Sequence, residues 1–268
     1  MPELPDVEHY RRFLAGHALG ARVERVVVTD SGILRNTDAA TLDGSLRGHR
    51  FDQPERRGKW LIAWTSGPAV LLHFGMTGDL VWGADELGRH RHDRVIFVLD
   101  RGELRYRNVR KLGGLWLAHG PDDVEPMLSG LGPDALTLDR PAFEGLLGHR
   151  RGQVKAALMD QSLLSGVGNL LADEILWRAR LHPARPVQDL TDTERRALFA
   201  ALRRTIRAGI DEFDGGMRTR WMRVRGHPGA RCPRCRTPLR RTVVAGRTTY
   251  FCPRCQPHPR ERSGSPRG

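Results

Sequence analysis

The chain has 268 residues, 39% of them hydrophobic, which excludes wholesale disorder and leaves room for two ordinary domains and a small appendage. Its 44 Lys and Arg against 31 Asp and Glu give a net charge of +13. This excess predicts a polyanionic partner, either nucleic acid or an anionic membrane surface, unless the basic surface is merely solvated. No stretch approaches the ~18 apolar residues of a membrane span, and the N-terminus lacks the regions of a signal peptide, so we expect a cytoplasmic protein that does not bind membranes.

The N-terminal half predicts one helix followed by strands. A helix over 6–19 is expected because Pro5 suits a first turn and an approximate apolar face follows, made by Val7, Tyr10, Leu14 and Ala18. Short β-like runs separated by turn signals occupy 23–28, 60–65, 70–74, 94–99, 103–107 and 115–118. Strands at this spacing favour a β-sandwich or barrel.

Gly, Pro and Asp cluster over 120–141, and beyond that the apolar period is helical. Thr191 and Glu194 form a capping box ahead of an amphipathic helix. Residues 214–231 show no clear period and predict a mobile loop, and the segment after 256 predicts a disordered tail. We therefore expect an α+β protein with domains over 1–120, 121–225 and 226–256, and a tail over 257–268.

The only four cysteines form two CxxC pairs separated by sixteen residues: Cys232, Cys235, Cys252 and Cys255. This spacing suits one tetrahedral Zn²⁺ held by four thiolates, and a closed four-Cys site makes the metal structural. The alternative is a pair of redox dithiols, which rarely occur doubled in a basic hairpin. The stretch between the pairs predicts a β-hairpin turning at Ala245-Gly246.

Pro2 follows the initiator methionine, and its small side chain permits methionine removal, which would leave a free secondary amine. An α-amino group has a pKa near about 8, so a useful fraction is neutral at pH 7 and can attack an electrophilic sugar carbon. Glu3 lies beside it in the chain and could transfer protons. Taken alone, this start is far more often structural than catalytic.

Six motifs in fixed order favour a catalytic interpretation of the N-terminal Pro2-Glu3 segment. They are PELPDVE at 2–8, GKWL at 58–61, HFGMTG at 73–78, LMD at 158–160, GVGN at 166–169 and the paired CxxC. Together they resemble the formamidopyrimidine-DNA glycosylase/endonuclease VIII family over nearly the whole chain. The resemblance implies an N-terminal β-sandwich flanked by helices, a helical domain with a helix–two-turn–helix motif, and a small β-hairpin zinc finger.

The same resemblance implies an enzyme of base-excision repair, a bifunctional DNA glycosylase and AP lyase that acts on double-stranded damaged DNA. Pro2 is implied as the Schiff-base nucleophile and Glu3 as the acid at the sugar ring. Lys59 matches the lysine that contacts phosphate and assists β-elimination, although outside this context it would be a solvated strand-edge residue. Arg247 matches the finger arginine that grips phosphate and is linked to δ-elimination.

Several further positions are implied to contact DNA. Asn169 opens a helix after a glycine turn, where backbone N–H groups predict a phosphate site; a dinucleotide loop is rejected because no strand precedes it, and a plain helix–helix turn is the alternative. His92 and one of Arg150 or Arg151 match basic DNA contacts, although His92 also lies in an HRHD segment that could mimic a metal cluster. Met76 matches the residue that fills the hole left by an extruded base, unless it is an ordinary core methionine, and Arg110 matches the residue that pairs with the orphaned base.

Three departures from the family pattern concern the choice of base. Leu112 stands where a wedge phenylalanine is common, Arg225-Gly226-His227 replaces Tyr-Gly-Arg, and 210–225 is shorter than in members that cap 8-oxoguanine. They put 8-oxoguanine excision in doubt more than activity on formamidopyrimidines, oxidised pyrimidines or abasic sites. The preferred lesion, the opposite base and the choice between β- and β,δ-elimination stay open.

Two other functions compete with the enzyme, which we expect to be a monomer. A catalytically silent damaged-DNA-binding protein on the same scaffold would need no free N-terminal proline. A zinc-ribbon RNA-binding module would explain the basic finger and leave the N-terminal motif unexplained.

Overall fold

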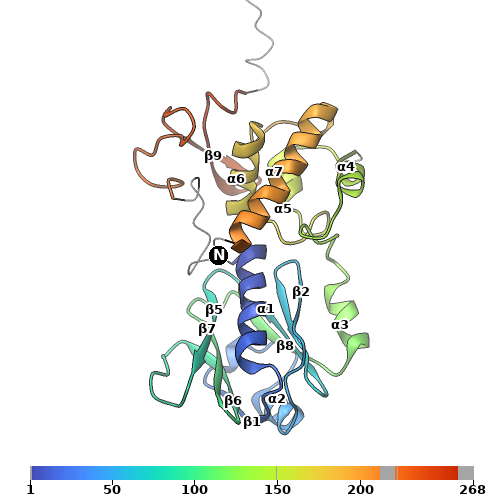
Figure 1. The fold of residues 1–268 in the computed structure, drawn as a ribbon, viewed down its shortest axis with the longest axis vertical. Coiled ribbons are helices and arrows are strands. Elements are labelled where there is room, and N and C mark those ends of the chain that lie inside the picture. Colours follow the sequence, from blue (N-terminus) through green and yellow to red (C-terminus); the bar gives the residue numbers. More distant parts are fainter. Residues whose placement is uncertain (1, 149, 212–220, 222, 259–268) are drawn as a thin grey trace, which may run out of the picture. The chain divides into compact units, whose positions relative to one another are not determined.

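The computed structural model describes residues 2–148, 150–211, 221 and 223–258. The chain forms two compact units (Figure 1). The first unit holds Pro2 and Asp6–Gly130, and the second holds Glu3–Pro5 with the described part of Leu131–Gly268. The contacts of Glu3 and Leu4 thus assign them to the second unit, although the rest of that unit is far from them in sequence.

The first unit is built on two four-stranded antiparallel sheets, with strand orders β1-β6-β7-β5 and β2-β3-β4-β8. The strands are β1 (Val23–Val28), β2 (Glu55–Arg57), β3 (Trp60–Ala63), β4 (Ala69–His73), β5 (Gly78–Gly83), β6 (Asp93–Leu99), β7 (Gly102–Asn108) and β8 (Gly114–Ala118). The helices are α1 (Leu4–Ala18), α2 (Ala39–Leu46) and α3 (Pro121–Leu128), with a 3₁₀ turn η1 at Ser31–Ile33.

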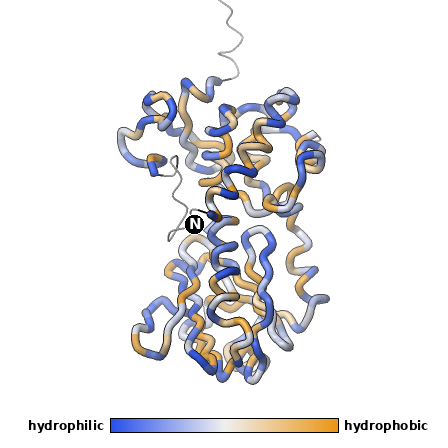
Figure 2. The backbone as a smooth tube through the Cα atoms, viewed as in Figure 1, coloured by the Kyte–Doolittle hydropathy of each residue, from blue (hydrophilic) through white to orange (hydrophobic). Residues whose placement is uncertain are grey.

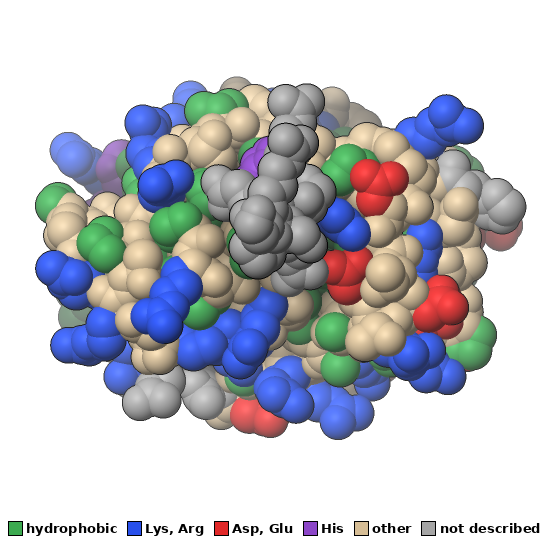
Figure 3. All heavy atoms as spheres, turned by 90° about the horizontal axis from the view of Figure 1, so that it is seen from above, with side chains coloured by type: hydrophobic (Ala, Val, Ile, Leu, Met, Phe, Trp, Pro, Cys, Tyr) green, Lys and Arg blue, Asp and Glu red, His purple; other side chains and the backbone are tan. Residues whose placement is uncertain are grey.

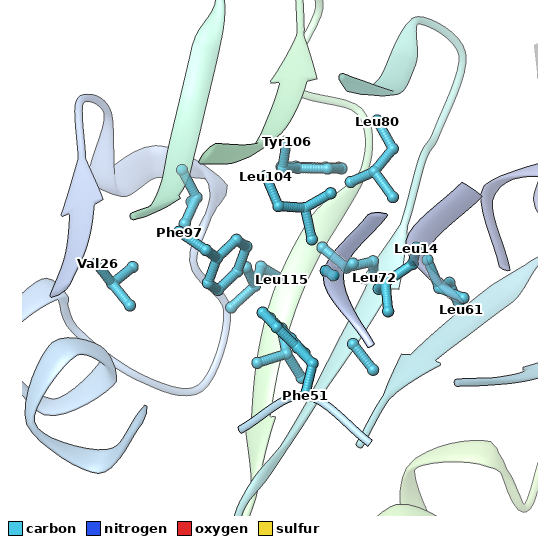
Figure 4. Packing of buried hydrophobic residues seen from close by; sticks show 14 of the residues in the cluster. Leu14, Val26, Phe51, Leu61, Leu72, Leu80, Phe97, Leu104, Tyr106 and Leu115 are labelled. Atoms are coloured by element: carbon cyan, nitrogen blue, oxygen red, sulfur yellow. The ribbon is translucent and has the colours of Figure 1, made fainter. Parts of the chain in front are cut away.

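The core of the first unit gathers inward-facing side chains from both sheets and from α1 (Figure 4). Phe51 meets Phe97 edge to face with ring centroids 5.7 Å apart. Leu14 of α1 and Leu61 and Leu72 of the second sheet are fully buried in the same cluster. The predicted sandwich with a flanking helix is therefore confirmed.

Five described elements of this unit were not predicted: β2, β5, α2, α3 and η1. The first three carry weak local signals. β2 is Glu55-Arg56-Arg57, a charged edge strand that pairs with β3 and whose Arg56 and Arg57 form ion pairs with Glu8 and Glu125. β5 begins and ends in glycine, and α2 spans eight residues that include Thr, Asp, Gly and Ser. Local propensity is weak in all three, so tertiary pairing decides their conformation.

The second unit contains α4 (Arg140–Gly148), α5 (Val154–Met159), α6 (Asn169–Ala179), a 3₁₀ turn η2 (Val187–Asp189) and α7 (Asp192–Asp211), followed by the hairpin β9 (Arg240–Val244) and β10 (Arg247–Phe251). The predicted capping box is present, since Glu194 N donates to Thr191 Oγ1 over 3.2 Å and Thr191 N donates to Glu194 Oε2 over 3.0 Å. The hairpin turns at Ala245-Gly246, both with positive φ, as predicted.

Hydrophobic and hydrophilic residues are interspersed along both units (Figure 2). Among the described residues, no helix combines the length and apolar character needed to cross a membrane. Residues 214–220 and 222 of the expected loop over 214–231, most of the shortened segment over 210–225 and most of the expected tail lie outside the described residues. Trp221, which belongs to that loop, is fully buried and stacks on Trp177 with ring centroids 5.2 Å apart.

Candidate active site and zinc centre

The Glu3 carboxylate is held by the first turn of α6. It accepts three backbone hydrogen bonds, from Gly168 N and Leu170 N at 2.9 Å each and from Leu171 N at 3.0 Å. These are the N–H groups that a helix leaves unpaired at its start, where the helix dipole also favours negative charge. The side chain is fully buried, so its position is fixed from several directions.

The GVGN motif fits this cradle closely. A Cβ on Gly168 would lie 2.3 Å from the Glu3 carboxyl carbon, and Gly166 adopts φ +103°, where a Cβ would lie 2.5 Å from the Leu4 side chain. Leu4 N also donates to Gly166 O over 3.1 Å. We expected the start of α6 to bind phosphate. Three of its backbone N–H groups instead donate to the carboxylate of Glu3.

Asn169 belongs to a buried charge cluster that connects α5, α6 and β10. Lys155 Nζ donates to Asn169 Oδ1 at 2.7 Å and Thr249 Oγ1 at 2.6 Å, and pairs with Asp173 Oδ1 at 2.7 Å. Lys155 is fully buried, and desolvation lowers its pKa although Asp173 acts in the opposite direction. Asn169 Nδ2 donates to Thr248 O at 3.1 Å, so the amide joins the hairpin to α6, and its predicted DNA contact stays a prediction.

Asp173 also forms an ion pair with Arg225, a residue that departs from the family pattern. Arg225 Nε lies 2.7 Å from Asp173 Oδ2, and its guanidinium lies 5.1 Å from the centre of the Tyr250 ring. Sequence reasoning gave no role to Lys155 or Asp173. The only signal is the i, i+4 spacing of Asn169 and Asp173, which places both on one face of α6.

The four cysteine Sγ atoms lie within 4.8 Å of one another. Cys235 Sγ is 3.4 Å from both Cys252 Sγ and Cys255 Sγ, and Cys232 Sγ is 3.9 Å from Cys255 Sγ. A tetrahedral zinc with Zn–S bonds of about 2.3 Å separates its ligands by about 3.8 Å, so the set fits one structural Zn²⁺. Trp177 Nε1 donates to Cys232 Sγ at 3.3 Å, which links α6 to the centre.

Arg247 is the first residue of β10 and is exposed directly after the hairpin turn. Arg150 pairs with Asp160, whereas Arg151 is exposed. Lys and Arg side chains are spread over the face in Figure 3, and Asp and Glu are fewer there. In the second unit, the exposed Arg151 and Arg247 are cations that suit a polyanion.

In the first unit, the loops that follow β4 and β7 carry exposed apolar side chains. Met76 is 41% exposed and Leu112 is 54% exposed, which argues against Met76 as an ordinary core residue. Arg110 is exposed between them in sequence. His92 is half-buried, and its Nδ1 lies 2.9 Å from Arg94 Nη2. Within the described chain the cysteine set is the one group suited to a metal, so nothing supports a metal at HRHD.

We expected Lys59 on a strand. It lies instead in the turn between β2 and β3, after Gly58 with φ +56°. Its charge acts on His73, which ends β4 and pairs with Trp60 in the sheet. Burial, together with the positive charge of Lys59, lowers the pKa of His73 to about 4. His73 Nδ1 accepts the backbone N–H of Gly75 at 3.3 Å, so the ring serves as a neutral acceptor.

A lowered histidine pKa makes the first unit less stable in mild acid. Unfolded His73 takes up a proton near pH 6.5 and folded His73 only near 4, so its contribution to stability is complete above pH 6.5 and is lost as pH falls to 4. We expect this to amount to on the order of 1–2 kcal/mol. Urea unfolding at pH 7, 5.5 and 4.5 should show a smaller loss for His73→Asn than for the wild type; equal losses would contradict the assignment.

Comparisons with known proteins match the sheets of the first unit, the helices of the second unit and the zinc finger to one family. Residues 1–115 match the formamidopyrimidine-DNA glycosylase N-terminal domain, 130–220 its H2TH domain, and 229–257 the zinc finger found in FPG and IleRS. The Symbiobacterium thermophilum formamidopyrimidine-DNA glycosylase is 40% identical, over 100% of this chain and 93% of that protein. The Thermus thermophilus protein of that name is 39% identical, over 96% and 98%.

Solved structures give the same result for the fold. The Lactococcus lactis Fpg in complex with abasic-site DNA superimposes with a TM-score of 0.88 at 28% identity, over 96% of this chain and 100% of that one. A G226P variant of it, bound to DNA that contains Fapy-dG, gives 0.86 at 27% identity with the same coverage. The chain therefore belongs to the formamidopyrimidine-DNA glycosylase/endonuclease VIII family of DNA base-excision repair glycosylases.

Proposed function

We propose that the protein excises oxidised bases from double-stranded DNA and nicks the strand through a Schiff base on Pro2. The observation that carries the proposal is the Glu3 carboxylate, buried and fixed by three backbone N–H groups. The hydrogen bonds hold this carboxylate in one place, and an acid fixed one peptide bond from an amine suits sugar chemistry.

The chemistry balances without a cofactor in the reacting position. The Pro2 nitrogen forms a bond to C1′ of the damaged nucleotide as the N-glycosidic bond breaks, and the base leaves with that bond's electron pair and takes a proton. Glu3 protonates O4′, so the sugar ring opens and leaves an iminium between Pro2 and C1′. Loss of a C2′ proton then expels the 3′ phosphate in β-elimination, and water finally releases Pro2 from the sugar.

Phosphate contacts divide between the units in this proposal. Lys59 holds phosphate and assists β-elimination, and the exposed Arg247 holds phosphate where δ-elimination would follow. His92, Asn169 and Arg151 act as further DNA contacts; Arg151 is preferred to Arg150 because Arg150 is paired with Asp160. Met76, Arg110 and Leu112 enter the duplex when the lesion is extruded.

The remaining features of the proposal are organisational. Functional domains over 1–120, 121–225 and 226–256 act in one monomer in the bacterial cytoplasm. The zinc, when bound, supplies folding energy to the finger and no chemistry to the reaction.

A panel of duplexes, each with one lesion, tests the function. The lesions are 8-oxoguanine, formamidopyrimidine, an oxidised pyrimidine and an abasic site. We expect base release and strand cleavage on at least the last three, with 3′ ends that distinguish β- from β,δ-elimination on a sequencing gel. Tight binding to all four without any cleavage would favour the catalytically silent damaged-DNA-binding protein.

A further inference from the structure

Two neighbouring loops of the first unit carry the side chains assigned above to the extruded lesion. The β4–β5 loop (74–77) carries Met76, and the β7–β8 loop (109–113) carries Arg110 and Leu112. Their tips are exposed and partly apolar, and Val109 adds a further side chain that is 49% exposed. Isolated loops with such tips would be costly to order on binding.

Asn108, the last residue of β7, bonds to both loops from a fully buried position. Its Oδ1 accepts Lys111 N at 2.9 Å in one loop and Thr77 Oγ1 at 3.3 Å in the other. Its Nδ2 donates to Phe74 O at 3.3 Å and to Tyr106 Oη at 3.0 Å. One amide therefore satisfies partners in both loops and on the strand behind them.

Thr77 joins the loops directly. Its hydroxyl donates to Asn108 Oδ1 and accepts the backbone N–H of Arg110 at 3.0 Å. Gly75 allows the close approach, because it adopts φ +59° and a Cβ there would lie 2.5 Å from Gly113 N. Loop register is thus fixed by hydrogen bonds and by a glycine that no larger residue can replace without displacing the backbone.

The β7–β8 loop is held in a strained conformation. Lys111, between Arg110 and Leu112, has φ +52°, a left-handed conformation that is unfavourable for a residue other than glycine. Three contacts hold Lys111. Its backbone N–H donates to Asn108 Oδ1, and its carbonyl accepts from Arg35 Nη2 at 3.2 Å. Its ammonium pairs with Asp30 Oδ2 at 3.0 Å. Several contacts thus hold the unfavourable conformation of Lys111, which indicates that the loop conformation serves to present Arg110 and Leu112.

We propose that Asn108 and Thr77 are positioning residues that fix the two loops as one preformed unit, so that Met76, Arg110 and Leu112 enter the duplex together. The inference rests on the proposed function. Extrusion of a nucleotide is unfavourable, and a preformed unit loses no binding energy to the ordering of its loops. Neither residue needs to touch DNA for this effect.

Thr77→Val tests the inference, because valine keeps the shape of threonine and removes both hydrogen bonds of the hydroxyl. Thr77→Ser restores the hydroxyl. Thr29→Val is the matched control, since the Thr29 hydroxyl donates to Asp93 O at 2.6 Å in the same unit, at neither loop. Single-turnover cleavage is measured on an abasic site in a duplex and on the same strand unpaired, with 2-aminopurine opposite the site in the duplex to report local unstacking.

We expect Thr77→Val to lower the duplex rate and the rate of the 2-aminopurine signal about fivefold to tenfold, as for loss of one or two hydrogen bonds. The rate on the unpaired strand, which has no hole to fill, should stay within about twofold, and Thr77→Ser and Thr29→Val should match the wild type. Equal losses on both substrates, or no loss on the duplex, would overturn the inference while the wild type remains active. A wild type inactive on both would overturn the proposed function itself.

Discussion

Replacing Glu3 by Gln is expected to lower the single-turnover rate of base excision by about 10²–10³-fold, because a general acid in this role contributes that much. The cause is twofold. Gln cannot donate the proton that opens the sugar ring. Its amide group also turns an N–H₂ toward backbone N–H donors that now meet carboxylate oxygens at 2.9–3.0 Å. Rapid-quench measurement on a base lesion, at enzyme in excess, gives the rate directly.

The matched control is Glu8→Gln, which removes a buried carboxylate of α1. Glu8 pairs with Arg11 at 2.9 Å and Arg12 at 3.0 Å, and these cations help to lower its pKa although burial opposes them. This change should reduce thermal stability and leave the excision rate of the folded protein near that of the wild type. A Glu3→Gln variant that keeps more than about a tenth of the rate would exclude Glu3 as the acid.

Removal of zinc is expected to unfold the finger and weaken binding to abasic-site duplex by at least about tenfold, since a segment this small depends on its metal for folding. The hairpin contributes few apolar side chains, and Arg247 is presented only while the turn at Ala245-Gly246 persists. The apolar cluster of α4–α7 is separate from the cysteine cluster, so most helical circular dichroism should remain.

Tryptophan emission offers a second readout of the metal. Trp177 donates to Cys232 Sγ and stacks on Trp221, so chelation should change the emission and added Zn²⁺ should restore it together with DNA binding. Metal analysis should return one zinc per chain, and Cys232→Ser should behave as the chelated protein. Unchanged DNA affinity after complete chelation would contradict the role given to the finger.

The parts of the fold that could be predicted are those with strong local signals. The β-branched run of β1 was predicted with its observed ends, and the capping box of α7 and the four cysteines follow from spacing alone. The edge strand β2 could not be predicted, because its charged residues are placed by pairing with β3. Helix α2 could not be predicted, because its eight residues include Thr, Asp, Gly and Ser and give a weak helical signal.

The candidate site divides in the same way. Pro2, Glu3 and Lys59 are visible as residue types in motifs, but nothing local shows that the GVGN turn receives a carboxylate from the other end of the chain. The cluster of Lys155 and Asp173 is invisible for the same reason, since its partners come from three elements. Long-range hydrogen bonds leave no periodic trace in a sequence.

Borohydride trapping on abasic-site duplex tests the central claim most directly, because reduction converts an iminium into a stable covalent link. The wild type is compared with a form that retains Met1, whose proline nitrogen lies in a peptide bond, and with Pro2→Gly. The account predicts one adduct per chain in the wild type, mapped by mass spectrometry to Pro2, and loss of the adduct when Met1 is retained. An adduct of equal yield in the Met1-retaining form, or one mapped to a lysine, would contradict the Pro2 mechanism.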